Sequence, residues 1–174
     1  ESVCLLFIIN DMEEFRIDCL YQTEEELVVT KELRQNIFRL NHTMPDTEEY
    51  RELLHKVFPH LGENCRIETP FSGVRTANVK FGRNVIVMPG CLMISAGGIT
   101  IGENAEVGVG EYAESKYDKK VYQFDLVTIG ERSVIPDGVK IGRNTAISGV
   151  TTAEDYHGGE LESGDYIIKA GGIQ

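Results

Sequence analysis

The feature that most constrains the fold is an internal repeat of six residues that begins after residue 60. In each unit an aliphatic or aromatic residue is usually followed by Gly and soon after by Asn or Asp. The clearest members of the repeat are Leu61, Ile67, Phe81, Val87, Met93, Ile101, Val107, Ile129, Ile135, Ile141 and Ile147. A helix repeats every 3.6 residues and a strand every 2, so neither explains a register of six. The spacing predicts short strands separated by turns.

One strand and one turn take six residues, so three such sides close a triangular coil of roughly eighteen residues. The aliphatic residue that heads each unit then points into the coil and stacks on its equivalent in the next coil. Gly or Asn at the corners tolerates the positive φ of a tight turn. The alternative is a series of ordinary hairpins with Gly-x-Asn turns, which predicts period-2 alternation between the turns. The sequence is therefore predicted to be mainly β, a parallel β-helix.

Residues 1–60 carry helix signals and no repeat. Thr23 followed by Glu26 fits a capping box and predicts a helix over 24–40. Asp46-x-x-Glu49 is expected to cap a second helix that Pro59 ends. Its apolar stripe is Tyr50, Leu53, Leu54, Val57 and Phe58. We therefore predict two parts, an N-terminal α-helical hairpin within 1–60 and the coil over 61–174, with a loop excursion at about 111–125.

The charge balance excludes several classes of partner. There are 17 Lys and Arg residues against 28 Asp and Glu, which gives a net charge of −11. Such a surface repels phosphate backbones and anionic lipids, so neither nucleic acid nor a membrane is an expected partner. The longest apolar run, residues 3–9, is too short to span a bilayer.

The cysteine pattern bears on metal binding and on the cellular compartment. Cys4, Cys19, Cys65 and Cys91 form no C-x-x-C pair and predict no metal site. We expect them to be small buried hydrophobes in a reducing compartment, which predicts a cytoplasmic protein.

The order of motifs over residues 33–107 resembles the hexapeptide-repeat acyltransferases, in particular the maltose and galactoside O-acetyltransferase group. The residues that carry this resemblance are Asn41-His42-Thr43-Met44-Pro45, Gly62-Glu63-Asn64, Thr69-Pro70-Phe71, Gly82-Arg83-Asn84, Met88-Pro89-Gly90-Cys91 and Ile101-Gly102-Glu103-Asn104. The resemblance implies a left-handed parallel β-helix, a homotrimer and acetyl-CoA as co-substrate. It also implies a sugar hydroxyl as acceptor and a His as general base in a groove between subunits, because such a hydroxyl is a poor nucleophile at neutral pH.

Three positions depart from that pattern. The expected His falls within residues 115–122, where the chain has none. The Asn and Asp that contact the acceptor in the group fall near Met88 and Ala96, whose side chains bind no hydroxyl. His157, between Asp155 and a Gly pair, is the one imidazole beyond residue 60 and a candidate base, although such a residue is more often solvated in a turn. His42, His55 and His60 are interpreted as surface or capping residues, so the catalytic and cofactor-binding residues stay unassigned.

Residues 106–174 resemble a different protein, the C-terminal β-helix of bacterial glucose-1-phosphate adenylyltransferases, on Ile129-Gly130-Glu131-Arg132-Ser133-Val134-Ile135-Pro136 and Ile141-Gly142-Arg143-Asn144. The two resemblances leave three hypotheses about function. The first is an acetyl-CoA-dependent sugar O-acetyltransferase, with activity altered or lost, whose groove is lined by residues 81–125. The second is a non-catalytic module for oligomerisation or regulation, and the third is a structural repeat protein without a ligand.

The basic residues of the predicted excursion leave two interpretations open. Lys116, Lys119 and Lys120 lie among tyrosines. On the first interpretation they bind the phosphates of CoA or of a phosphosugar. On the second they belong to a loop that covers the coil and binds no ligand.

Overall fold

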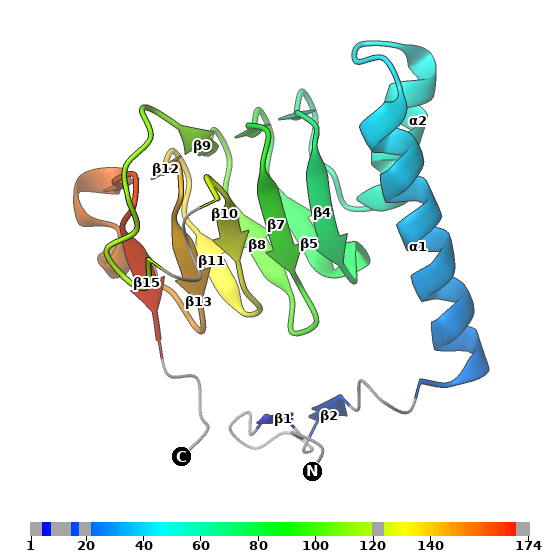
Figure 1. Cartoon of the computed structure of the whole chain (residues 1–174), viewed down its shortest axis with the longest axis horizontal. Coiled ribbons are helices and arrows are strands. Elements are labelled where there is room, and N and C mark those ends of the chain that lie inside the picture. The colour runs from blue at the N-terminus through cyan, green and yellow to red at the C-terminus, as the bar shows by residue number, and fades with distance from the viewer. Residues whose placement is uncertain (1–4, 8–14, 18–21, 120–123, 170–174) are drawn as a thin grey trace.

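The computed structural model describes residues 5–7, 15–17, 22–119 and 124–169 (Figure 1). Two short strands, β1 (Leu5–Phe7) and β2 (Phe15–Ile17), pair antiparallel. The sequence predicted only helices in residues 1–60, so this strand pair is an addition. No helix in the described ranges is long and apolar enough to cross a membrane.

Two helices follow, α1 (Glu24–His42) and α2 (Glu48–Val57). The predicted capping box of α1 is confirmed, since the Thr23 side chain accepts from the Glu26 backbone N–H and the Glu26 carboxylate accepts from that of Thr23. The predicted cap of α2 is wrong by one residue. Its N-cap is Thr47, whose hydroxyl accepts from the backbone N–H of Tyr50, whereas Asp46 adopts a positive φ of 63° in the link.

The described residues after α2 pass through three parallel sheets, and each successive strand up to β13 enters a different sheet from the one before it. The first sheet contains β3 (Arg66–Ile67), β6 (Ile86–Val87), β9 (Glu106–Val109), β12 (Lys140–Gly142) and β14 (Glu160–Leu161). The second contains β4 (Phe71–Val74), β7 (Cys91–Ile94), β10 (Val127–Ile129), β13 (Ala146–Ser148) and β15 (Tyr166–Ile168). The third contains β5 (Val79–Phe81), β8 (Ile99–Ile101) and β11 (Ser133–Ile135).

The predicted three-sided parallel coil is therefore confirmed, but its first coils have a different number of residues from the one predicted. Arg66 pairs with Ile86 and Ile86 with Glu106, so each of these coils contains 20 residues. Thr128 pairs with Ala146, so the coil between them contains the expected 18 residues. Short 3₁₀ turns at Thr76–Asn78, Ala153–Asp155 and His157–Gly159 complete the coil, the last two in the stretch between β13 and β14.

The repeat residues form the core. Val87, Met93, Ile101, Val107, Ile129, Ile135 and Ile141 have no exposed surface, and Ile67 and Ile147 have 1% each. Stacking identical aliphatic positions buries a continuous apolar column along the coil axis. Leu61, at the start of the repeat, is only half-buried.

The helical hairpin covers one end of this column (Figure 1). Phe58 is fully buried and meets Phe71 and Phe81 edge-to-face at 5.0 and 5.2 Å between ring centroids. The Asn41 side chain donates to the carbonyl of Phe71 and accepts from its N–H, both at 2.9 Å. A sheet edge satisfied in this way is not available for pairing with another strand.

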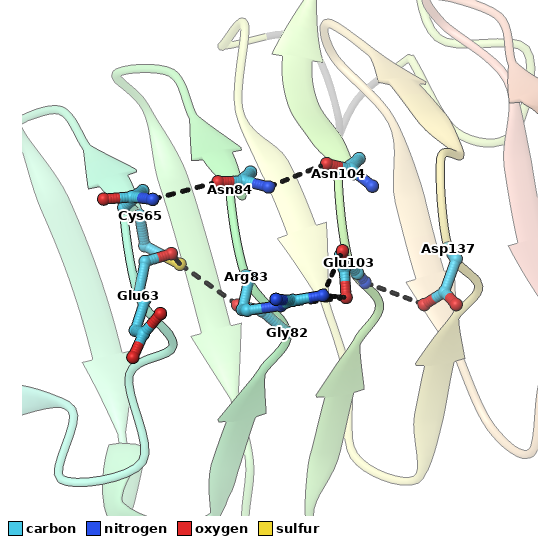
Figure 2. A network of polar contacts seen from close by, with 9 residues as sticks. Glu63, Cys65, Gly82, Arg83, Asn84, Glu103, Asn104 and Asp137 are labelled. Carbon is cyan, nitrogen blue, oxygen red and sulfur yellow. Dashed lines mark hydrogen bonds and ion pairs between the residues drawn. The ribbon is translucent and has the colours of Figure 1, made fainter.

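The corners of the coil correct one part of the sequence interpretation (Figure 2). Asn64, Asn84 and Asn104 adopt φ of 55–57°, as predicted for tight turns. Their side chains form a ladder, with Asn64 donating to Asn84 at 3.3 Å and Asn84 to Asn104 at 3.0 Å. The preceding glycines do not need positive φ. A Cβ on Gly82 would lie 2.5 Å from the backbone nitrogen of Glu103, so Gly is required because adjacent corners touch.

Candidate functional site

The excursion from the coil lies between the end of β9 at Val109 and the start of β10 at Val127. Its described first part folds back over the later coils (Figure 1). Lys116 donates its N–H to the carbonyl of Gly164 at 2.8 Å, and the Asn144 side chain donates to the carbonyl of Ala113 at 3.0 Å. Within the described residues, this segment contacts coil residues that are distant from it in the sequence.

Two of the three lysines that were candidates for binding phosphates form ion pairs within the protein. Lys116 pairs with Asp165 at 3.1 Å and with Glu162 at 3.5 Å. Lys119 pairs with Glu114 at 2.6 Å. These carboxylates raise the pKa of both lysines. A phosphate would have to displace them, so the structure favours the covering-loop interpretation for Lys116 and Lys119; Lys120 lies outside the described residues.

A cavity of about 580 Å³ lies beside residues 124–126, at the described end of the excursion. Phe124, Asp125 and Leu126 form one wall. Corner residues of the coil form the others, namely Pro70, Met88, Pro89, Gly90, Gly108, Val109, Gly110 and Arg143. All of these except Pro70, Leu126 and Arg143 fall within the range 81–125 that was predicted to line a groove. This cavity is the candidate functional site.

The two positions expected to contact an acceptor are separated. Met88 lines the cavity and is 37% exposed. Ala96 lies in the turn after β7, where its carbonyl accepts from the Asn78 side chain at 3.2 Å, and it is not among the cavity residues. Only the first of these positions is placed to meet a ligand here.

One charged pair lies in the cavity wall. Arg143 donates its Nε–H to Asp125 Oδ1 at 3.0 Å and a terminal N–H to the other carboxylate oxygen. This bidentate geometry raises the pKa of Arg143. Sequence reasoning missed the pair, because it assigned Asp125 to the excursion and Arg143 to the repeat and had no signal that joined them.

The structure places no histidine at this cavity among the residues it describes. His157 lies exposed in the 3₁₀ turn His157–Gly159, so its interpretation as a solvated turn residue is favoured over that of a base. His42, His55 and His60 lie at or near the surface, as predicted. In the described ranges no group of three or more metal-ligating side chains occurs.

Burial raises the pKa values of two cysteines and one tyrosine in the described residues. Burial raises the pKa of Cys91 to about 12 and that of Tyr156 to about 12. Burial also raises the pKa of the half-buried Cys65, so neither described thiol is a ready nucleophile. The prediction that cysteines are buried holds fully for Cys91 and partly for Cys65; Cys4 and Cys19 lie outside the described residues.

Comparison with known proteins agrees with two distinct resemblances. The chain is 26% identical to the galactoside O-acetyltransferase of Lactococcus lactis over 157 residues, which cover 82% of this chain and 70% of that protein. It is 62% identical to the glucose-1-phosphate adenylyltransferase of Lachnospira eligens over 64 residues, which cover 37% of this chain and only 15% of that protein. No protein-family profile matches the chain.

A solved structure agrees with the fold. The hexapeptide-repeat-containing acetyltransferase of Vibrio cholerae superimposes with a TM-score of 0.53 at 17% identity, over 84% of this chain and 83% of that one. The resemblance to the hexapeptide-repeat acyltransferases is thus confirmed, together with that of the C-terminal part to the adenylyltransferases.

Proposed function

We propose that this protein transfers an acetyl group from acetyl-CoA to a hydroxyl group of a small acceptor. The observation that carries the proposal is the cavity at Met88, because the resemblance implies an acceptor contact at that position. The similarity to a galactoside O-acetyltransferase over most of the chain supports the same reaction. A sugar hydroxyl is the acceptor that the resemblance implies, and it is the first to test.

In this reaction the acceptor oxygen attacks the carbonyl carbon of the acetyl thioester. A C–O bond forms, the C–S bond breaks, and the hydroxyl proton is balanced by the proton that the CoA thiolate takes up to become a thiol. A general base speeds such an attack by about 10²–10⁴-fold. Since the chain carries no His in residues 115–122, we expect slow turnover or a different base.

We further propose that the coil is left-handed and that three copies associate, as the resemblance implies. The outer face of the second sheet supports association because its outward positions carry no charge in a chain with net charge −11. These positions are Ser72, Val74, Leu92, Ile94, Thr128, Ser148, Tyr166 and Ile168. Charge-poor faces of this kind are typical of protein interfaces. In contrast, the outer face of the first sheet presents Arg66, Glu106, Lys140 and Glu160.

The division into a helical part over 1–60 and a coil over 61–174, and a cytoplasmic location, remain proposals. Sedimentation of the purified chain tests the assembly. A trimer at micromolar concentration that dissociates in an Ile94→Lys variant supports association through the second sheet, with Thr100→Lys on the third sheet as the matched control. A monomeric wild-type chain contradicts the trimer.

A second function is favoured by one observation, the 62% identity to an adenylyltransferase over 64 residues. On this hypothesis the coil is a non-catalytic module for oligomerisation or regulation. It predicts no turnover with any acceptor.

One experiment separates the two functions. Acetyl-CoA is titrated into the purified chain by calorimetry, and thiol release is then followed with a panel of sugars. Micromolar binding, about −8 kcal/mol, together with turnover supports the acetyltransferase. Binding without turnover indicates a cofactor groove whose base is lost, and no binding at millimolar CoA contradicts acetyl transfer and leaves the module.

A further inference from the structure

We infer that the cavity accepts a molecule with an apolar body and one hydroxyl or amino group, such as an aryl alcohol, in preference to a polyhydroxylated sugar. The role of this molecule as an acetyl acceptor rests on the proposed function. The preference itself rests on the walls of the cavity and on the state of its polar groups.

The side chains in the walls are mostly apolar. Phe124 is 70% exposed, and Leu126 and Met88 are 38% and 37% exposed, so a ligand in the cavity would bury apolar surface on three sides. Pro89 adds a rigid apolar edge beside Met88. Burial of apolar surface favours a ligand with hydrocarbon surface of its own.

Glycines keep the cavity open. Gly90, Gly108 and Gly110 line it, with φ of 78°, 80° and 88°. A Cβ on Gly108 would lie 3.2 Å from the Cβ of Met88 and narrow the space. At these backbone angles any other residue is strained, so this part of the wall has no side chain to offer a hydrogen bond.

Several of the polar groups at the cavity are already paired within the protein. The Gly90 N–H donates to the carbonyl of Pro70 and its carbonyl accepts from the N–H of Val127, each at 2.9 Å. Asp125 and Arg143 bind each other. A sugar brings several hydroxyl groups, and each one that loses water without gaining a partner costs free energy.

Further polar contacts are available at the Asp125–Arg143 pair. A carboxylate has about four acceptor sites, and Arg143 occupies one on each oxygen of Asp125. Asp125 can therefore accept up to two further hydrogen bonds from a ligand while keeping its partner, and Arg143 has N–H groups that these two bonds do not use. Both groups belong to one ion pair, so one hydroxyl group on an apolar body can donate to Asp125 and accept from Arg143.

The test measures binding without acetyl-CoA. The probes are 2-phenylethanol and methyl β-galactoside, each followed by saturation-transfer NMR and by calorimetry on the full chain. We expect saturable binding of 2-phenylethanol and about tenfold weaker binding of the galactoside. Equal or tighter binding of the galactoside, or no saturable binding of the alcohol, overturns the inference.

Two variants locate the binding. Phe124→Ala removes an exposed wall residue without opening the core, and we expect it to weaken 2-phenylethanol binding by about tenfold. Tyr112→Ala changes an exposed aromatic residue of the same excursion that does not line the cavity, and we expect no change. Undiminished binding in Phe124→Ala places the ligand elsewhere and overturns the inference.

Thiol release from acetyl-CoA with bound 2-phenylethanol is measured separately. Release supports both the ligand class and its role as acceptor. Binding that depends on Phe124 without thiol release upholds the ligand class and counts against acetyl transfer, so the two claims fail independently.

Discussion

The contact between adjacent coil corners predicts that Gly82→Ala is strongly destabilising. Gly82 lies outside the positive-φ region, so alanine fits its backbone angles. The difficulty is space, because the new Cβ would lie 2.5 Å from the backbone nitrogen of Glu103 and 2.7 Å from its Cα. These are backbone atoms, which cannot rotate away as a side-chain end would.

The cost follows from the separation that the extra atom demands. Ordinary contact begins at 3.4 Å, so the corners must part by about 0.9 Å. The hydrogen bond from the Gly82 N–H to the carbonyl of Ile101 is 2.7 Å long and would be stretched beyond its useful range. Overpacking costs about 1–3 kcal/mol and a lost backbone hydrogen bond about 1 kcal/mol, so we expect a loss of about 3 kcal/mol.

Gly138→Ala is the matched control. Gly138 has φ of 69°, but a Cβ added there would meet no atom within 4 Å, so alanine is strained at this position and not crowded. The left-handed conformation costs about 1–2 kcal/mol, partly offset by a less flexible unfolded chain, so we expect a loss of about 1 kcal/mol.

Urea denaturation and thermal unfolding measure both variants against wild type. For a chain of this size, about 3 kcal/mol lowers Tm by roughly 6–12 °C. A Gly82→Ala variant within about 0.5 kcal/mol of wild type, or one less affected than Gly138→Ala, refutes the close-approach reasoning.

Three further predictions concern the core, alkaline pH and the helical cap. Ile101→Ala leaves a cavity in a fully buried stack, and we expect it to lower the free energy of unfolding by about 2–5 kcal/mol; a loss under about 1 kcal/mol in urea denaturation contradicts the stacking. The pKa of Cys91 is raised from 9.0 to about 12 by burial, so above pH 9 the unfolded chain loses the thiol proton first and stability falls as pH rises toward 12. Between about pH 8 and 11 the free energy of unfolding of wild type should fall by about 2–3 kcal/mol more than that of Cys91→Ala. Equal losses in the two proteins contradict the raised pKa of Cys91. Tyr50→Phe removes the hydroxyl that donates to the buried carbonyl of Ile67 at 2.7 Å, and we expect a cost of about 1–3 kcal/mol in the same assay, with Tyr112→Phe unchanged.

Much of the fold was predictable because its signals are local. The six-residue spacing of Ile129, Ile135 and Ile141 and their equivalents predicted the coil and its core, since a repeating period shows in the order of residues alone. The apolar stripe of α2 and the Thr23 capping box were correct for the same reason. The cap at Thr47 was missed because Asp46 and Thr47 are both good caps and only the backbone angles separate them.

The candidate site was predictable only as a region. Residues 81–125 were expected to line a groove, and most of the cavity lies there. Arg143, which binds Asp125 across 18 positions of sequence, was not expected. No periodicity relates these two residues, and only the return of the excursion to the corner of the coil brings them together.

By itself the sequence determined the repeat, the buried column and the helices that cover its end, because each depends on spacing along the chain. The tertiary structure decided why Gly82 is glycine, where the excursion lies, and which polar groups at the cavity are already paired. These depend on distances between residues a full coil apart, and such distances arise only when the coils stack.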